Sequence, residues 1–78
     1  MKIEVLGAGC PKCQTTEQLV RKALAELNVQ ADVVKVTDIN AIIERGVMMT
    51  PALLIDGKLV VQGRIPTLDQ VKQFIAAG

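Results

Sequence analysis

The chain has 78 residues, half of them apolar, and a formal net charge of +1 that comes from nine basic and eight acidic side chains. This length fits one domain, residues 1–78, near the lower limit of what folds without a metal or several disulfides. The charges form no runs and Phe74 is the sole aromatic residue, so the sequence lacks the clustered basic face and the stacking side chains of a nucleic-acid-binding protein.

The first half of the chain predicts a strand followed by a long helix. Residues 2–6 alternate in polarity, as a half-buried strand does, and Gly7 and Gly9 allow the backbone to bend after it. The helix is expected from about Pro11 to Leu27, because proline is favoured at the first helical position. Its buried stripe is predicted to consist of Thr16, Val20, Ala23, Leu24 and Leu27.

The end of this helix leads into a second strand. Glu17 and Arg21 are spaced to pair across one turn on the outer face of the helix, and Asn28 is expected to stop it. Residues 31–36 form a β-branched run and predict the second strand. Because the helix lies between the two strands, they should be parallel, as in a βαβ crossover.

A short helix is predicted next. Asp38 is expected to cap it and Gly46 to end it. Thr50-Pro51 then interrupts the chain, since proline stops a helix and starts a strand at an unpaired position. The inward side chains of this segment are expected to be Ile39, Ile42, Ile43 and Val47.

A hairpin and a last helix complete the chain. Strands 52–55 and 58–62 flank Asp56-Gly57, a strong hairpin signal. Thr67 and Gln70 have the spacing of a capping box for the last helix. The predicted order is therefore β-α-β-α-β-β-α, an α/β fold. The last helix should face inward with Leu68, Val71, Phe74 and Ile75.

Both cysteines lie at the predicted start of the first helix, and the sequence contains no histidine. Unpaired backbone N–H groups and the helix dipole favour negative charge there, and Lys12 adds a cation. The pKa of Cys10 should therefore lie below the ~8.5 of a free thiol. Cys13 follows Pro11 and Lys12 and lies one helical turn after Cys10, close enough for the two sulfurs to form a disulfide. Cys10 is thus predicted to attack a disulfide and Cys13 to resolve the mixed disulfide.

The expected location of the chain is cytoplasmic. No apolar run approaches the ~20 residues of a membrane span, and the N-terminus lacks the pattern of a secretory signal. In a reducing cytosol, a CxxC pair more often catalyses redox reactions or binds a metal than forms a structural disulfide.

Other roles for the pair have to be weighed. A static disulfide would close a very short segment and constrain the unfolded chain little, and plain core packing does not explain the Gly-rich turn. The serious alternative is a soft-metal carrier that binds Cu(I), Hg(II) or Zn(II) through the two thiolates. The CxxC spacing alone does not separate this carrier from an oxidoreductase. Met48 and Met49 are expected to fill gaps or line a surface, not to bind metal.

The chain as a whole resembles the thioredoxin fold, and more narrowly the small thioredoxin/glutaredoxin-like redox-active disulfide proteins of bacteria and archaea. The motifs that carry this resemblance are Cys10-Pro11-Lys12-Cys13, Thr50-Pro51 before the third strand, the Asp56-Gly57 hairpin, and Gly63 before a closing helix. The resemblance covers nearly all 78 residues. It implies a four-stranded mixed sheet of order 2-1-3-4, with helices on both faces.

The resemblance also implies roles for individual residues. Cys10 matches the nucleophile of the family and Cys13 its resolving thiol. Thr50-Pro51 matches the cis-proline loop, which would lie beside Cys10, with the backbone of Thr50 pairing to an extended substrate. Met49 is expected to line the same substrate surface.

The chain departs from the larger families in several positions. Thioredoxins carry a tryptophan before the first cysteine and a buried acid beneath the second, whereas this chain has Gly9 and, near the place of the acid, Glu4, whose alternation points it to solvent. Lys12 replaces the aromatic residue of glutaredoxins, and their glutathione-binding turn is missing. Strong dependence on glutathione is therefore not expected.

These observations together predict a monomeric thiol–disulfide oxidoreductase. It would act on protein disulfides and dithiols and be served by an unidentified reductase. Its redox group would be the Cys10–Cys13 disulfide, without a further cofactor or a metal, and neither nucleic acid nor membrane is expected as a partner.

Overall fold

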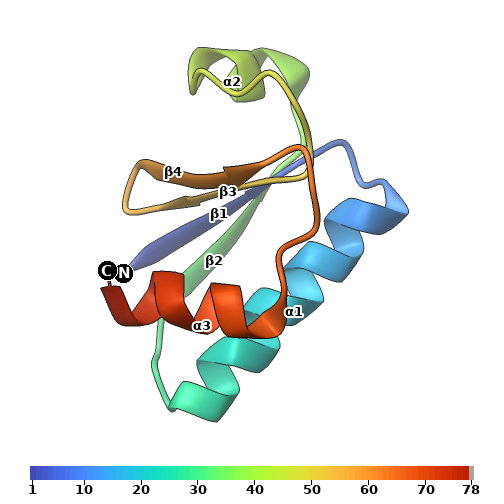
Figure 1. Cartoon of the computed structure of the whole chain (residues 1–78). Coiled ribbons are helices and arrows are strands. Elements are labelled where there is room, and N and C mark those ends of the chain that lie inside the picture. The colour runs from blue at the N-terminus through green and yellow to red at the C-terminus, as the bar shows by residue number, and fades with distance from the viewer. Residues whose placement is uncertain (78) are drawn as a thin grey trace.

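The computed structural model describes residues 1–77, which form a four-stranded mixed sheet with helices on both faces (Figure 1). The strand order is β2-β1-β3-β4; β1 is parallel to β2 and antiparallel to β3, and β3 is antiparallel to β4. The elements are β1 (Lys2–Leu6), α1 (Pro11–Leu27), β2 (Asp32–Val36), α2 (Ile39–Glu44), β3 (Ala52–Ile55), β4 (Lys58–Gln62) and α3 (Leu68–Ala77). The predicted α/β fold class, element order and parallel crossover are confirmed.

The two faces of the sheet carry separate apolar cores. Helices α1 and α3 cover one face, and α2 covers part of the other (Figure 1). The larger core, on the α1 and α3 side, contains Ile3, Val5, Val20, Ala23, Leu24, Leu53, Ile55, Val61, Val71 and Ile75. The smaller core, beneath α2, contains Leu6, Val36, Ile42, Val47, Ala52 and Leu54. Successive residues of β1 therefore alternate between the two cores, because strand side chains point to opposite faces.

The predicted caps and turns are present. Asn28 ends α1 in the left-handed region, with φ of 55°. Gln70 Oε1 accepts from Thr67 N at 3.0 Å and Thr67 Oγ1 accepts from Gln70 N at 3.1 Å, which is the reciprocal pattern of a capping box. Asp56 and Gly57 both have positive φ, 50° and 84°, as a tight hairpin turn requires.

Three side chains predicted to face inward are exposed. Ile39 and Ile43 are 63% and 62% exposed, because the six-residue α2 rests on the sheet through Ile42 and leaves its other sides uncovered. Leu27 is 36% exposed, because the last turns of α1 extend beyond α3 (Figure 1). Helical periodicity identified these residues as apolar but did not show how far the neighbouring layer reaches.

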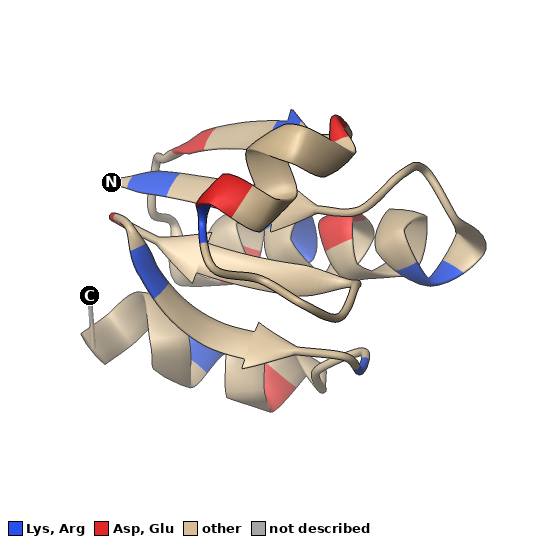
Figure 2. Ribbon diagram, turned by 90° about the horizontal axis from the view of Figure 1, so that it is seen from above, with Lys and Arg blue, Asp and Glu red and all other residues tan. Residues whose placement is uncertain are grey.

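Figure 2 shows acidic and basic residues interspersed over the elements, without one charged face. Over residues 1–77, no helix is both long enough and apolar enough to cross a membrane.

Glu4 is buried, contrary to the prediction that it points to solvent. It does point away from Ile3 and Val5, but that side of β1 is covered, and Glu4 is 6% exposed. Arg45, the C-cap residue of α2, donates from Nε to Glu4 Oε2 at 2.5 Å and from Nη1 to the carbonyl of Ala41 at 3.0 Å. This ion pair fastens the C-terminal end of α2 to the central strand.

We expect Arg45→Met to destabilise the fold by about 1–3 kcal/mol, because it removes the hydrogen-bonded partner of the buried Glu4 carboxylate and leaves it only Lys2, at 3.9 Å. The double variant Glu4→Met/Arg45→Met should recover most of this loss, since it removes both charges. Denaturant unfolding measures both effects.

The matched control is Lys72→Met, which breaks the Glu26–Lys72 pair on the other side of the sheet. The side chain of Glu26 is 39% exposed, so the loss should be clearly smaller than that of Arg45→Met, because solvent screens the pair. Equal losses for Arg45→Met and Lys72→Met would contradict a special role for the buried pair.

Candidate active site at the start of helix α1

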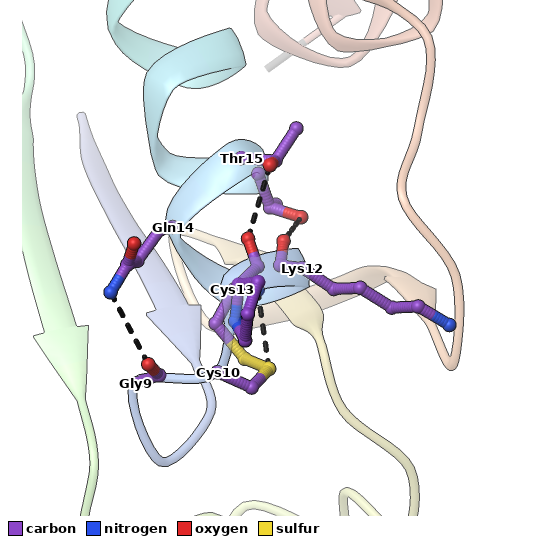
Figure 3. Close-up of a disulfide and its surroundings, with 8 residues drawn as sticks. Gly9, Cys10, Lys12, Cys13, Gln14 and Thr15 are labelled. Atoms are coloured by element: carbon purple, nitrogen blue, oxygen red, sulfur yellow. Dashed lines mark hydrogen bonds between the residues drawn. A yellow bond between two sulfur atoms is a disulfide. The ribbon is translucent and has the colours of Figure 1, made fainter.

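A disulfide joins Cys10 and Cys13 at the first turn of α1 (Figure 3). Their Cα atoms are 5.1 Å apart. Cys10 is the N-cap residue, in extended conformation, and Pro11 is the first helical residue, as predicted. Cys10 Sγ accepts a hydrogen bond from the backbone N–H of Cys13 at 3.3 Å. A charge-stabilising donor therefore already points at the sulfur of Cys10.

The two sulfur-bearing residues differ in exposure. Cys13 is 5% exposed and belongs to the buried stripe of α1, whereas Cys10 is half-buried. An incoming disulfide thus has access to the sulfur of Cys10 and not to that of Cys13.

Gly7 lies directly against the disulfide. A Cβ atom built on Gly7 would overlap Cys13 Sγ and lie 3.7 Å from Thr50 Cβ. The N–H of Gly7 donates to the carbonyl of Val36 at 2.9 Å, which fixes the end of β1 in this position. The sequence indicated Gly7 as a bend residue; its second role, the close approach to Cys13, follows from the tertiary packing.

The loop before β3 lies beside the same site. The Thr50–Pro51 peptide bond is cis, as the resemblance implied. Pro51 is fully buried and its carbonyl accepts from Gly63 N at 2.9 Å. Met49 is 57% exposed and packs on Gly63, where an added Cβ would come within 3.2 Å of Met49 Cβ. Thr50 therefore lies beside Gly7 and the disulfide, whereas Met49 lies against Gly63, after β4.

Lys12 is exposed, and Figure 3 shows its side chain extending away from the two sulfur atoms. Its charge can act on Cys10 as a field across solvent but not as a direct hydrogen bond. The amide of Gln14 donates to the carbonyl of Gly9 at 3.3 Å and closes the loop before α1 (Figure 3).

An apolar groove of about 660 Å³ opens next to the Cys10 loop. Met48, which is 92% exposed, stands at this groove, and none of its lining residues is charged. The lining is Ala8, Ile39, Ile42, Ile43, Gly46, Val47, Met48 and Thr50. Sequence reasoning missed the groove because it placed Ile39 and Ile43 in the core.

A second, smaller space lies behind Cys13. This crevice has a volume of about 70 Å³ and is lined by Val5, Gly7, Gly9, Cys13, Gln14, Glu17, Lys35 and Thr37. Unlike the groove, it is lined by several polar and charged side chains.

Glu17 is the acidic residue of this crevice. It pairs with Arg21 Nε at 3.0 Å, as predicted, and also with Lys35 Nζ at 3.6 Å. Its side chain is 16% exposed, because Lys35 of β2 also pairs with it and partly covers it. The hydrogen bond from Arg21, together with the charge of Lys35, holds the pKa of Glu17 below its usual value, against the opposing effect of partial burial.

Residues 1–77 contain no group of three or more His, Cys, Asp or Glu side chains arranged to hold a metal ion. Among the His, Cys, Asp and Glu side chains of residues 1–77, a soft metal would therefore have two ligands, Cys10 and Cys13.

Residues 1–76 match the family model described as a thioredoxin domain. The chain is 44% identical over 71 residues to a thioredoxin of Methanocaldococcus jannaschii. The aligned region covers 91% of this chain and 81% of that protein. It is 34% identical over 76 residues to a thioredoxin of Methanothermobacter thermautotrophicus. Here the aligned region covers 97% of this chain and 99% of that protein.

We expect Gly7→Ala to displace Cys13, because the added methyl group has no space beside its sulfur. The variant should be destabilised by roughly 1–3 kcal/mol, as overpacked sites are, and its two thiols should close into a disulfide more slowly. Denaturant unfolding and timed thiol oxidation measure the two effects.

Gly46→Ala is the control, because Gly46 also has a positive φ, 75°, but an added Cβ there meets no atom within 4 Å. It should lose stability through backbone conformation alone, by about 1–2 kcal/mol, and close its disulfide at the wild-type rate. If Gly7→Ala closed its disulfide at the wild-type rate, the close contact between Gly7 and Cys13 would not matter for disulfide formation.

Proposed function

This chain belongs to the thioredoxin family and is a thiol–disulfide oxidoreductase, and on this basis we propose that Cys10 attacks the disulfides of protein partners and Cys13 resolves the product. The observation that carries these roles is the asymmetry of the pair. Cys10 is half-buried and its sulfur accepts a hydrogen bond from the backbone N–H of Cys13, whereas Cys13 lies on the buried face of α1.

The reaction has two displacements. The thiolate of Cys10 attacks one sulfur of the partner disulfide, and the other sulfur leaves as a thiolate. Cys13, as a thiolate, then attacks Cys10 Sγ, which releases the partner in its dithiol form and leaves the Cys10–Cys13 disulfide. Two electrons pass from the dithiol of this chain to the partner, and a reductase returns them.

The surface around Cys10 supports a polypeptide as the substrate. The apolar groove at α2 begins at Ala8 and Thr50, beside the disulfide loop, and offers exposed aliphatic side chains to a chain that binds there. We propose that the backbone of Thr50, which lies beside Gly7 and the disulfide, pairs with the extended substrate, and that the exposed Met49 lines the same substrate surface. Burial of such apolar surface is the usual source of affinity for a partner.

The metal-carrier alternative is not favoured, because the matches that cover nearly the whole chain are to thioredoxins. We propose that the protein acts as a monomer in the cytoplasm, where a reducing environment can regenerate its dithiol. The Cys10–Cys13 pair would then be its redox group, with Lys12 favouring the thiolate of Cys10 and no added cofactor.

We expect Cys13→Ser to accumulate a covalent mixed disulfide with a protein substrate through Cys10, because the second displacement is lost. Cys10→Ser should form no such adduct. Non-reducing electrophoresis and mass spectrometry after incubation with insulin detect the adduct, and both variants should lose turnover. Turnover that survives in Cys10→Ser would overturn the assigned roles.

We expect Ile43→Ser to raise the KM for a protein disulfide by roughly three- to tenfold, since it removes part of an apolar contact of the groove. The rate with a small disulfide should not change, because such a substrate does not reach α2. Val34→Ser is the matched control: Val34 is an aliphatic residue on β2, 39% exposed and outside the groove. A KM that rises equally in both variants would argue against the groove as the docking surface.

A further inference from the structure

The sulfur-containing side chains are the ones that peroxides oxidise most readily. This chain has two cysteines and three methionines, and it contains no tryptophan, tyrosine or histidine. When Cys10 and Cys13 are joined in the disulfide, neither presents a free thiol. The thioethers of Met1, Met48 and Met49 are therefore the groups that a peroxide meets in this form of the protein.

The three methionines differ in exposure. Met48 is 92% exposed, Met49 is 57% exposed and Met1 is 39% exposed. The thioether of Met49 is also shielded on one side by Gly63, since a Cβ built on Gly63 would lie 3.3 Å from Met49 Sδ. Because peroxide reaches a thioether from solvent, Met48 is the methionine most open to oxidation.

Packing within the fold does not explain a methionine at position 48. Its side chain is almost fully exposed, so it buries little apolar surface and adds little to stability. Its backbone N–H donates to Gln62 Oε1 at 3.4 Å, which ties this stretch of chain to β4. The thioether therefore stands in solvent at the apolar groove beside α2, on a stretch of chain that is held in place.

Oxidation of Met48 would change the character of this groove. It converts an apolar thioether into a polar sulfoxide, whereas Thr50 supplies the one polar side chain of the present lining. A partner that covers the sulfoxide buries its oxygen, and burial of a polar group without a hydrogen-bond partner costs free energy. The sulfoxide form should therefore bind an apolar partner surface less well.

We propose that Met48 is a site of reversible oxidation by peroxide, and that its sulfoxide weakens the docking of protein partners at the groove. This inference rests on the proposed function, because it takes the groove as the docking surface. A lone pair of the Met48 sulfur attacks one oxygen of hydrogen peroxide, the S–O bond forms, the O–O bond breaks, and water leaves. The sulfur loses two electrons and the peroxide gains them.

The reverse step also balances. A methionine sulfoxide reductase supplies two electrons from a dithiol and two protons, and the oxygen leaves as water. Reduction of the Cys10–Cys13 disulfide alone leaves the sulfoxide in place. The protein would thus recover its dithiol before it recovers its full affinity for protein partners.

The first measurement locates the oxidation. The disulfide form is treated with hydrogen peroxide, and the sulfoxide at each methionine is followed over time by peptide mass spectrometry. Met48 should react about twofold or more faster than Met1, in line with its greater exposure. A Met48 that reacts no faster than Met1 would overturn the assignment of a preferred site.

The second measurement is the KM for insulin, after peroxide has been removed and the cysteine pair has been reduced with a small dithiol. Oxidation of the wild-type protein should raise this KM by roughly three- to tenfold, without changing the rate with a small disulfide. Treatment with methionine sulfoxide reductases for both sulfoxide epimers should return the KM to its starting value. Met48→Gln, which carries a polar group permanently, should have a raised KM without peroxide.

Two variants make the result specific to one sulfur. Met48→Leu retains an apolar side chain without a thioether, so its KM should be the same before and after peroxide. Met49→Leu retains Met48, so its KM should still rise on oxidation as in the wild type. Both variants keep Met1, whose oxidation shows that the peroxide treatment worked.

A KM that stays constant when Met48 is fully oxidised would overturn the inference, and so would a KM that rises equally in Met48→Leu. A slower rate with the small disulfide would also overturn it, because the damage would then lie at the cysteine pair. Ile43→Ser separates this failure from that of the proposed docking surface. If Ile43→Ser raises the KM and oxidised Met48 does not, the groove still docks the partner and only the role of Met48 is wrong.

Discussion

The hydrogen bond from the backbone N–H of Cys13 to Cys10 Sγ, at 3.3 Å, is the contact on which the site depends. It exists because Pro11 starts the helix one residue after Cys10, so that a free N–H of the first turn, that of Cys13, donates to the sulfur of Cys10. The same turn places Cys13 on the buried side of α1. One local element thus leaves Cys10 half-buried with a backbone N–H directed at its sulfur, and keeps Cys13 buried behind it.

The two faces of the sheet present different surfaces to the two cysteines. On the α1 and α3 face, the crevice with Glu17 and Lys35 adjoins the buried sulfur. On the α2 face, the apolar groove adjoins the accessible one. Gly7, at the end of β1, lies where the two regions meet, since its missing side chain lets Cys13 and Thr50 approach the same backbone position. The buried cysteine and the accessible one therefore border surfaces of different polarity, on opposite faces of a very small sheet.

Local signals predicted much of this structure. The Pro11 start, the Asn28 stop, the Thr67–Gln70 capping box and the Asp56-Gly57 turn each depend on a few neighbouring residues, and each is present as expected. The location of the cysteine pair at the N-terminus of α1 followed from the same kind of signal.

The errors concern burial, which depends on distant segments. Ile39 and Ile43 have helical spacing, but α2 is too short and too peripheral to bury both. The alternation of β1 gave the correct face for Glu4 but not the fact that Arg45 and α2 cover that face. The Glu17–Arg21 pair was predictable from spacing, whereas the arrival of Lys35 from β2 was not. Hydrophobic periodicity shows which side chains share one face of a helix or strand. It does not show whether another segment covers that face.

The attachment of α2 has a consequence for the range of partners. This helix is fixed to β1 at its C-terminal end by the Glu4–Arg45 pair and to the smaller core through Ile42, while Ile39 at its beginning stays exposed. The groove beside α2 carries the exposed Met48, and adaptable, Met-bearing surfaces favour promiscuous recognition. Under the proposed function, we expect such a surface to accept apolar side chains from more than one kind of partner.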